Sequence, residues 1–178
     1  KRRVGVVWGS GNGGFQTFQN QVIEFAHGDG TPRFSPYFIP KVLVDIVSGV
    51  LSIQYGFLGP NYSTISACAS ANHAISDAFN LIRLGKADII LTGGSEAAIC
   101  EAGIGGFNSL KALSTQNENY ASASRPFDQS RDGFVMGEGA AALILEDLEH
   151  AQKRGATIVA EVLGTGMAAD AYHLTGTH

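Results

Sequence analysis

The chain has 178 residues, of which 44% are hydrophobic and 16% are charged, and its formal net charge is −4. Its hydrophobicity is too high and its net charge too low for an intrinsically disordered chain, and two cysteines are too few for a disulfide framework. The chain is mildly acidic and its only basic run is residues 1–3, so we expect no nucleic-acid partner.

Few charged residues are available to cover a globule of this size. We therefore expect the chain to be part of a larger body, or to pack on a large partner, and its opening on an apolar strand pattern fits that expectation. The sequence has no stretch of about 18 uncharged apolar residues, so we expect no membrane association.

The first sixty residues predict one strand and two helices. Residues 4–8 form a continuous apolar run, typical of a buried strand, and the glycine-rich stretch 9–14 follows them. Apolar residues at helical spacing predict a helix that begins near Phe15, and the composition of residues 28–32 predicts a loop. A second helix is predicted over residues 40–57.

The middle of the chain predicts strand, helix and strand. Small and β-branched residues predict a strand over 62–67, and helical spacing predicts a helix over 71–84, with Gly85 in the position that ends it. Residues 87–92 are an unbroken apolar strand, which we expect Gly93-Gly94 to stop.

The last third of the chain adds two strands and a charged helix. Glycines interrupt the stretch 97–113, so we predict two short helices there in place of one. The polar composition of residues 114–131 predicts a long loop. We expect a buried strand over 135–145, a charged helix over 146–154 and a final strand over 158–163. Strands that alternate with helices, and that are apolar on both faces, predict an α/β layered fold with a sheet covered on both sides.

The glycine-rich stretch Gly9-Ser10-Gly11-Asn12-Gly13-Gly14 is the first candidate for chemistry. It partly matches a dinucleotide fingerprint, in which an acidic residue ends the next strand about 20 residues later. Here a helix and a loop occupy that interval, so we favour close backbone packing and expect no cofactor. We also expect no metal site, because no metal-ligand spacing appears among the histidines, cysteines and acidic residues.

Cys68 is the second candidate, because a predicted strand ends there and a helix begins within one or two residues. This is the geometry of a nucleophile elbow. Unpaired N–H groups at the start of a helix stabilise a thiolate, and they can also hold an oxyanion. The open alternative is a buried structural cysteine, which is the commoner fate of free cysteines. No strand-to-helix turn precedes Cys100, so we interpret it as structural.

A cysteine nucleophile usually needs a base, and the sequence offers no compelling one. The five histidines are His27, His73, His150, His173 and His178. His73 follows Cys68 by five residues, which predicts a position off the face of the helix that carries the cysteine. His150 is expected in solvent on the charged helix, whereas His173 follows the last predicted strand, where ligand-facing loops occur.

Cys68, with Ser66-Ala67 before it and Ala69-Ser70-Ala71 after it, resembles the active-site segment of the β-ketoacyl-acyl carrier protein synthases. These are condensing enzymes with the thiolase-like layered αβαβα fold. The resemblance extends, in order, to residues 9–14, 92–97, 105–107, 113–115, 124–128, 131–140 and 168–173. It is closest to the bacterial type II elongating enzymes.

The resemblance implies a role for several residues. Cys68 would accept an acyl chain from an acyl carrier protein as a thioester, and its N–H would be one oxyanion donor. Phe107 matches a position that lines the acyl pocket. Asn12 matches the pocket floor, where the family leads us to expect an aliphatic residue, so the chain-length preference stays open.

The resemblance also implies contacts with the carrier and its phosphopantetheine arm. Asp170, His173 and Thr175 match a mobile loop at the mouth of the pantetheine tunnel. Arg33 and Lys111 fall where the family presents basic residues to the acidic carrier protein, although ordinary surface charges are an equal alternative.

In family terms, residues 1–155 would be the main part of the first of two similar halves, and residues 156–178 the start of the second. The histidines that decarboxylate the malonyl thioester, and the second oxyanion donor, would then lie beyond His178. The parent enzyme would perform a decarboxylative Claisen condensation in fatty acid biosynthesis. Four charged residues of the 124–132 motif are better interpreted as a structural network: Arg125, Asp128, Arg131 and Asp132.

Several alternatives remain at this point. A ketosynthase of a polyketide or aryl-polyene pathway, or an inactive truncated fragment, fits the same motifs. The 131–140 segment argues against a thiolase or an initiating condensing enzyme, and the retained Cys68 argues against a non-catalytic chain-length partner. The resemblance further implies a cytoplasmic homodimer that pairs through the strand before Cys68.

Overall fold

The computed structural model describes residues 1–173 and residue 175. In these residues, one sheet has the strand order β2-β1-β3-β4. The strands are β1 (Val4–Gly9), β2 (Asn61–Thr64), β3 (Ile89–Glu96) and β4 (Gly139–Glu146). Strands β2 and β3 run parallel to β1, whereas β4 runs antiparallel to β3.

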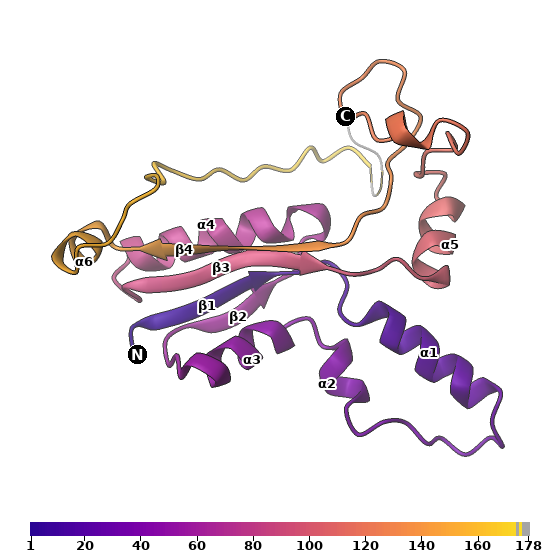
Figure 1. Cartoon of the computed structure of the whole chain (residues 1–178), viewed down its shortest axis with the longest axis horizontal. Coiled ribbons are helices and arrows are strands. Elements are labelled where there is room, and N and C mark those ends of the chain that lie inside the picture. The colour runs from indigo at the N-terminus through magenta and orange to yellow at the C-terminus, as the bar shows by residue number, and fades with distance from the viewer. Residues whose placement is uncertain (174, 176–178) are drawn as a thin grey trace.

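Helices lie on both sides of this sheet, as Figure 1 shows for α3 and α4. The α-helices are α1 (Phe15–Ala26), α2 (Phe38–Val42), α3 (Ile46–Tyr55), α4 (Ser70–Arg83), α5 (Glu101–Ser109) and α6 (Leu148–Lys153). Two short 3-10 helices are η1 (Ala67–Ala69) and η2 (Tyr120–Ser122). The predicted α/β layered fold is therefore confirmed.

The core lies between α4 and the sheet. Its buried members are Val7, Ala74, Ala78, Ala87 and Ile90. The small side chains come mainly from α4, and the larger aliphatic ones come from β1 and β3. This division lets the helix lie close to the strands, which fixes where its first turn meets the ends of β1 and β3.

Glycines under the first turn of α4 make this close approach possible. A Cβ atom at Gly9 would lie 2.5 Å from the backbone of Ser70, and one at Gly94 would lie 2.7 Å from Cβ of Ala71. These separations are far below van der Waals contact, so a side chain at either position would push the helix away from the sheet.

Two predicted boundaries in the first half of the fold are wrong. The single helix expected over 40–57 is two helices, because Leu43 has extended backbone (φ −66°, ψ 131°) between them. Strand β3 does not stop at Gly93-Gly94 but continues to Glu96, because β4 pairs with it along its whole length. Hydrogen bonds to a neighbouring strand outweigh the weak strand propensity of glycine.

The last third of the chain differs most from the prediction. Residues 97–113 hold one helix, α5, in place of two, and β4 begins at Gly139 and is mostly exposed. The strand predicted over 158–163 is absent, and residues 156–171 have no regular secondary structure. A strand needs a neighbour for its N–H and C=O groups, and the described residues offer none there.

The other predicted elements agree with the structure to within a few residues. Gly85 follows α4 with φ +66°, the left-handed conformation that ends a helix, as predicted. The loop over 114–131 is confirmed, with only η2 inside it. Within the described part of the chain, no helix has both the length and the apolar character that a membrane crossing requires.

Candidate active site around Cys68

Cys68 lies in η1, on the short connection between the end of β2 and the start of α4, and it is exposed. The alternative of a buried structural cysteine is therefore wrong for Cys68, whereas Cys100 is buried, as predicted. The predicted sharp strand-to-helix turn is confirmed. It places Cys68 two residues before the first residue of α4.

The residue before the cysteine has a strained backbone. Ala67 has φ +49°, in the left-handed region, which costs a residue with a Cβ atom about 1–2 kcal/mol. Such a conformation persists only where the surroundings hold it, and it occurs often at functional sites. Here it turns the chain sharply, so that the cysteine projects from the turn.

Side chains of α4 and β2 hold this turn. The Ser70 hydroxyl donates to the Ala67 carbonyl (2.7 Å) and accepts a hydrogen bond from the N–H of Ser66 (2.9 Å). Thr64 donates to the carbonyl of Ser70 (2.8 Å). The Ser66 hydroxyl in turn lies 2.6 Å from Nδ1 of His73. His73 thus reaches the turn that carries Cys68, although its spacing predicted a position away from it.

The glycine-rich loop after β1 lies beside the same turn. A Cβ atom at Gly11 would lie 3.6 Å from the Ala67 carbonyl oxygen. The Glu96 carboxylate, at the end of β3, accepts hydrogen bonds from the N–H groups of Gly11 (2.7 Å) and Asn12 (3.1 Å). These donors are the kind that would hold a phosphate, and a carboxylate already occupies them.

The second half of this loop packs on α2. Cβ atoms at Gly13 and Gly14 would overlap the carbonyl groups of Val42 and Lys41. The interpretation of the stretch as close backbone packing is therefore confirmed. The predicted site residue Asn12 directly follows Gly11, which lies beside the Cys68 turn.

Phe107 lies on α5 and packs edge-to-face on Phe134, with ring centroids 5.2 Å apart and an interplanar angle of 84°. Phe134 is fixed by two backbone hydrogen bonds: its N–H donates to Ala112 (2.9 Å) and its carbonyl accepts from Ser114 (2.9 Å). The aromatic partner of the predicted pocket residue is thus Phe134, which sequence reasoning placed in a motif but did not single out.

The predicted tunnel-mouth residues lie together at the end of the described chain. The N–H of Tyr172 donates to Asp170 (3.3 Å), and the N–H of Thr175 donates to Nδ1 of His173 (3.2 Å). Figure 1 shows the chain that follows α6 running back along the length of the sheet toward these residues.

The two predicted carrier-binding residues lie on different loops. Arg33, between α1 and α2, pairs with Asp29 at 3.1 Å, and both side chains are more than half exposed. Lys111 follows α5 and is exposed, with φ +53°. An exposed pair such as Arg33–Asp29 adds little stability, so Arg33 stays available to a partner. Lys111 is available because its side chain is exposed.

The charged residues of the 124–132 motif bind within their own loop, as a structural network requires. Asp132 accepts hydrogen bonds from the Ser114 hydroxyl (2.7 Å) and the Thr115 N–H (2.9 Å), which lower its pKa to about 2. Arg125 lies 3.8 Å from Asp132, and Arg131 donates to the carbonyl of Asp128 (2.8 Å).

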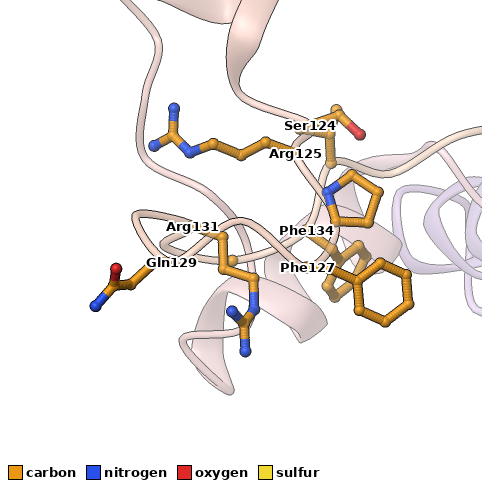
Figure 2. A pocket seen from close by; sticks show the side chains of 9 residues that line it. Ser124, Arg125, Phe127, Gln129, Arg131 and Phe134 are labelled. Atoms are coloured by element: carbon orange, nitrogen blue, oxygen red, sulfur yellow. The ribbon is translucent and has the colours of Figure 1, made fainter.

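This loop also lines a pocket of about 640 Å³, shown in Figure 2. It is lined by Ser124, Arg125, Pro126, Phe127, Gln129, Arg131, Gly133, Phe134 and Val135. A second pocket of about 270 Å³ shares Phe134 and Val135 with it. Cys68 lines neither of these two pockets and is exposed.

Sequence comparison gives one family and close relatives. Residues 1–151 match the family model described as Beta-ketoacyl synthase, N-terminal domain. The chain is 49% identical to a chloroplastic 3-oxoacyl-[acyl-carrier-protein] synthase I of Arabidopsis thaliana, covering 98% of this chain and 37% of that protein. It is 48% identical to a 3-oxoacyl-[acyl-carrier-protein] synthase 2 of Staphylococcus aureus, covering 97% and 42%.

Solved structures give the same fold. A β-ketoacyl synthase from Burkholderia phymatum matches with a TM-score of 0.84 and 35% identity, covering 97% of this chain and 42% of that one. The ishigamide ketosynthase/chain length factor matches with a TM-score of 0.85 and 31% identity, covering 97% and 41%. The predicted thiolase-like fold is confirmed, and the chain spans about two fifths of the length of these relatives.

Proposed function

This chain belongs to the β-ketoacyl synthase family, and we propose that it carries the acyl-accepting part of a 3-oxoacyl-[acyl-carrier-protein] synthase. The observation that carries the proposal is the position of Cys68. It is exposed, it follows a strained residue, and it lies at the N-terminal end of a 14-residue helix. Helix N-termini favour negative charge, which suits both a thiolate and a developing oxyanion.

In the proposed first step, the Cys68 thiolate attacks the carbonyl carbon of an acyl thioester on the carrier's phosphopantetheine. Negative charge develops on the carbonyl oxygen, where the Cys68 N–H donates a hydrogen bond. The new C–S bond forms as the old one breaks, and the pantetheine thiolate leaves and takes up a proton. The acyl group is then held on Cys68.

In the second step, a malonyl thioester loses carbon dioxide, and the resulting carbanion attacks the acyl-Cys68 carbonyl. This forms the new carbon–carbon bond and releases the Cys68 thiolate. Decarboxylation calls for histidines that we assign to none of the five in this chain. Residues 1–155 would be the main part of the first half of the enzyme, and 156–178 the beginning of the second.

Contacts with the substrate follow from the same proposal. Phe107, on Phe134, would line the acyl pocket, and Asn12 would lie at its floor beside the Cys68 turn. Asp170, His173 and Thr175 would border the tunnel for the pantetheine arm.

The acyl carrier protein is the proposed partner, with Arg33 and Lys111 as the basic contacts. One similar solved structure, 34% identical with a TM-score of 0.76, is described as a type II PKS acyl-carrier protein in complex with its ketosynthase. That alignment covers 88% of this chain and 40% of the other.

We further propose a cytoplasmic homodimer that pairs through β2. This strand lies at the edge of the described sheet, with one side unpaired, so a second copy can extend the sheet there. A full-length protein that runs as a uniform monomer at micromolar concentration would contradict this.

The experiment is intact mass spectrometry of the full-length protein after incubation with acyl carrier proteins loaded with saturated chains of different lengths. We expect the mass to increase by one acyl group, the increase to vanish in Cys68→Ala, and Cys100→Ala to be acylated like the parent. An acylated Cys68→Ala variant, or a parent protein that accepts no acyl group, would overturn the proposal.

A ketosynthase of a polyketide pathway is the second candidate, because three of the similar structures are described as polyketide or chain-length-factor assemblies. The same mass measurement separates the two. For a polyketide ketosynthase, we expect carriers loaded with polyunsaturated or poly-β-keto chains to acylate Cys68 faster than carriers with saturated chains. For a fatty acid synthase enzyme, we expect the reverse order.

A further inference from the structure

We propose that His73 is a positioning residue for Cys68, and that it acts through the hydroxyl of Ser66. The inference rests on the proposed role of Cys68 as nucleophile. It concerns a residue whose sequence spacing gave it no part in the site, and the contact that carries it is the 2.6 Å separation between Nδ1 of His73 and Oγ of Ser66.

His73 and Ser70 both reach the turn from one face of α4, since residues three apart are neighbours on a helix. They hold different groups. Ser70 binds the N–H of Ser66 and the carbonyl of Ala67, whereas His73 binds the side chain of Ser66. Ser66 is thus fixed at its backbone and at its hydroxyl, and it directly precedes the left-handed Ala67.

This restraint matters because the turn is strained. Ala67 has φ +49°, in the left-handed region that residues with a Cβ atom rarely adopt, and Ser66 directly precedes it. Strained residues keep their conformation only where surrounding contacts over-determine it. Loss of the His73 contact lets Ser66 rotate, and the Cys68 sulfur then moves relative to the N-terminus of α4.

Among the described residues, His73 contacts this turn through Ser66, and no hydrogen bond joins it to Cys68. Its Nδ1 is engaged with Ser66, either as the acceptor of the hydroxyl proton or as the donor, according to the tautomer. The imidazole therefore acts on the position of the thiol. A displacement of about 1 Å at a reacting atom can reduce a rate by about 100-fold.

The chain provides a matched control. The Tyr62 hydroxyl donates to Asp77 at 3.1 Å, which is a side-chain hydrogen bond between β2 and α4, away from the turn. Tyr62→Phe removes that bond and leaves Ser66 and His73 in place. A merely structural role for His73 predicts similar effects of Tyr62→Phe and His73→Phe on the reactivity of Cys68.

The test uses the full-length protein and two rates at Cys68: acyl transfer from a loaded carrier protein, and alkylation by iodoacetamide. We expect His73→Phe to slow both at least about tenfold. His73→Asn, whose amide can still bind Ser66, should recover most of the rate. Tyr62→Phe should stay within about twofold of the parent. Melting temperatures establish that each variant is folded.

A double-mutant cycle with Ser66→Ala tests the route of the effect. If His73 acts through Ser66, then His73→Phe has no further effect on either rate in the Ser66→Ala background. Additive effects, a parent-like rate in His73→Phe, or an equal loss in Tyr62→Phe would each overturn the inference. If the parent accepts no acyl group, the proposed function fails, and the alkylation rates alone decide the role of His73.

Discussion

The Glu96 carboxylate accepts a 2.7 Å hydrogen bond from the backbone N–H of Gly11, and this contact joins the end of β3 to the loop that follows β1. The same carboxylate accepts from the N–H of Asn12. Since this loop lies beside the Ala67 carbonyl, Glu96 holds in place a loop that packs next to the Cys68 turn.

Replacing Glu96 by alanine leaves two loop N–H groups without their acceptor. We expect Glu96→Ala to lower the free energy of unfolding by about 1–3 kcal/mol, and Glu96→Gln, which keeps one carbonyl acceptor, to cost less. Urea unfolding of the full-length protein measures both. Hydrogen exchange at Gly11 and Asn12 should accelerate in the alanine variant, and unchanged exchange there would contradict the role assigned to Glu96.

The two cysteines should react at very different rates. Cys68 is exposed on the turn, whereas Cys100 is only 6% exposed at the start of α5. We expect brief treatment of the folded full-length protein with an acyl-mimicking electrophile to label Cys68 selectively, as measured by peptide mass spectrometry. Equal labelling of the two cysteines would contradict the assignment of Cys68 as nucleophile, and labelling in denaturant gives the control.

Two glycine substitutions should have opposite effects on stability, because the space available to a Cβ atom differs between the two positions. Gly9→Ala would place a methyl group 2.5 Å from the backbone of Ser70, and overpacking of this kind typically costs about 1–3 kcal/mol. Gly49, in α3, has no atom within 4 Å of a Cβ position, so Gly49→Ala should stabilise its helix by up to about 1 kcal/mol. Thermal unfolding of the two variants checks both signs, and a neutral Gly9→Ala would show that the helix can move.

Two carboxylates predict loss of stability in acid. Arg154 donates two hydrogen bonds to Glu146 (2.6 and 2.7 Å), which lowers the pKa of Glu146 from 4.5 to about 2. Hydrogen bonds from Ser114 and Thr115 lower that of Asp132 from 3.8 to about 2. Both groups bind protons more readily when unfolded, so their stabilisation is complete above about pH 5 and is lost as the pH falls toward 2.

We therefore expect the melting temperature to fall between pH 5 and pH 2, and the fall to be smaller in Glu146→Gln than in the parent. Differential scanning calorimetry across this range provides the measurement. A Glu146→Gln profile that parallels the parent would show that the Arg154 contact does not contribute to the acid transition.

Local sequence determined most elements of the fold. Residues 4–8 and 71–84 carry their own periodicity, and Gly85 ends α4 as its left-handed φ requires. These patterns can be recognised without knowledge of neighbouring segments, because an apolar helix face or an apolar run is a local feature of the sequence. The prediction of a strand over 158–163 is wrong because it used only a local pattern. An apolar run indicates a preference for burial, but a strand forms only against a partner strand.

The sequence by itself also determined the position of the turn around Cys68, since a predicted strand, the cysteine and a predicted helix follow one another closely. Only the tertiary structure decided what holds that turn. Glu96 and Gly11 are 85 residues apart, and His73 meets Ser66 because the strained turn folds back on α4. Hydrogen bonds between distant segments depend on how helices and strands pack, and no periodicity within one segment encodes them.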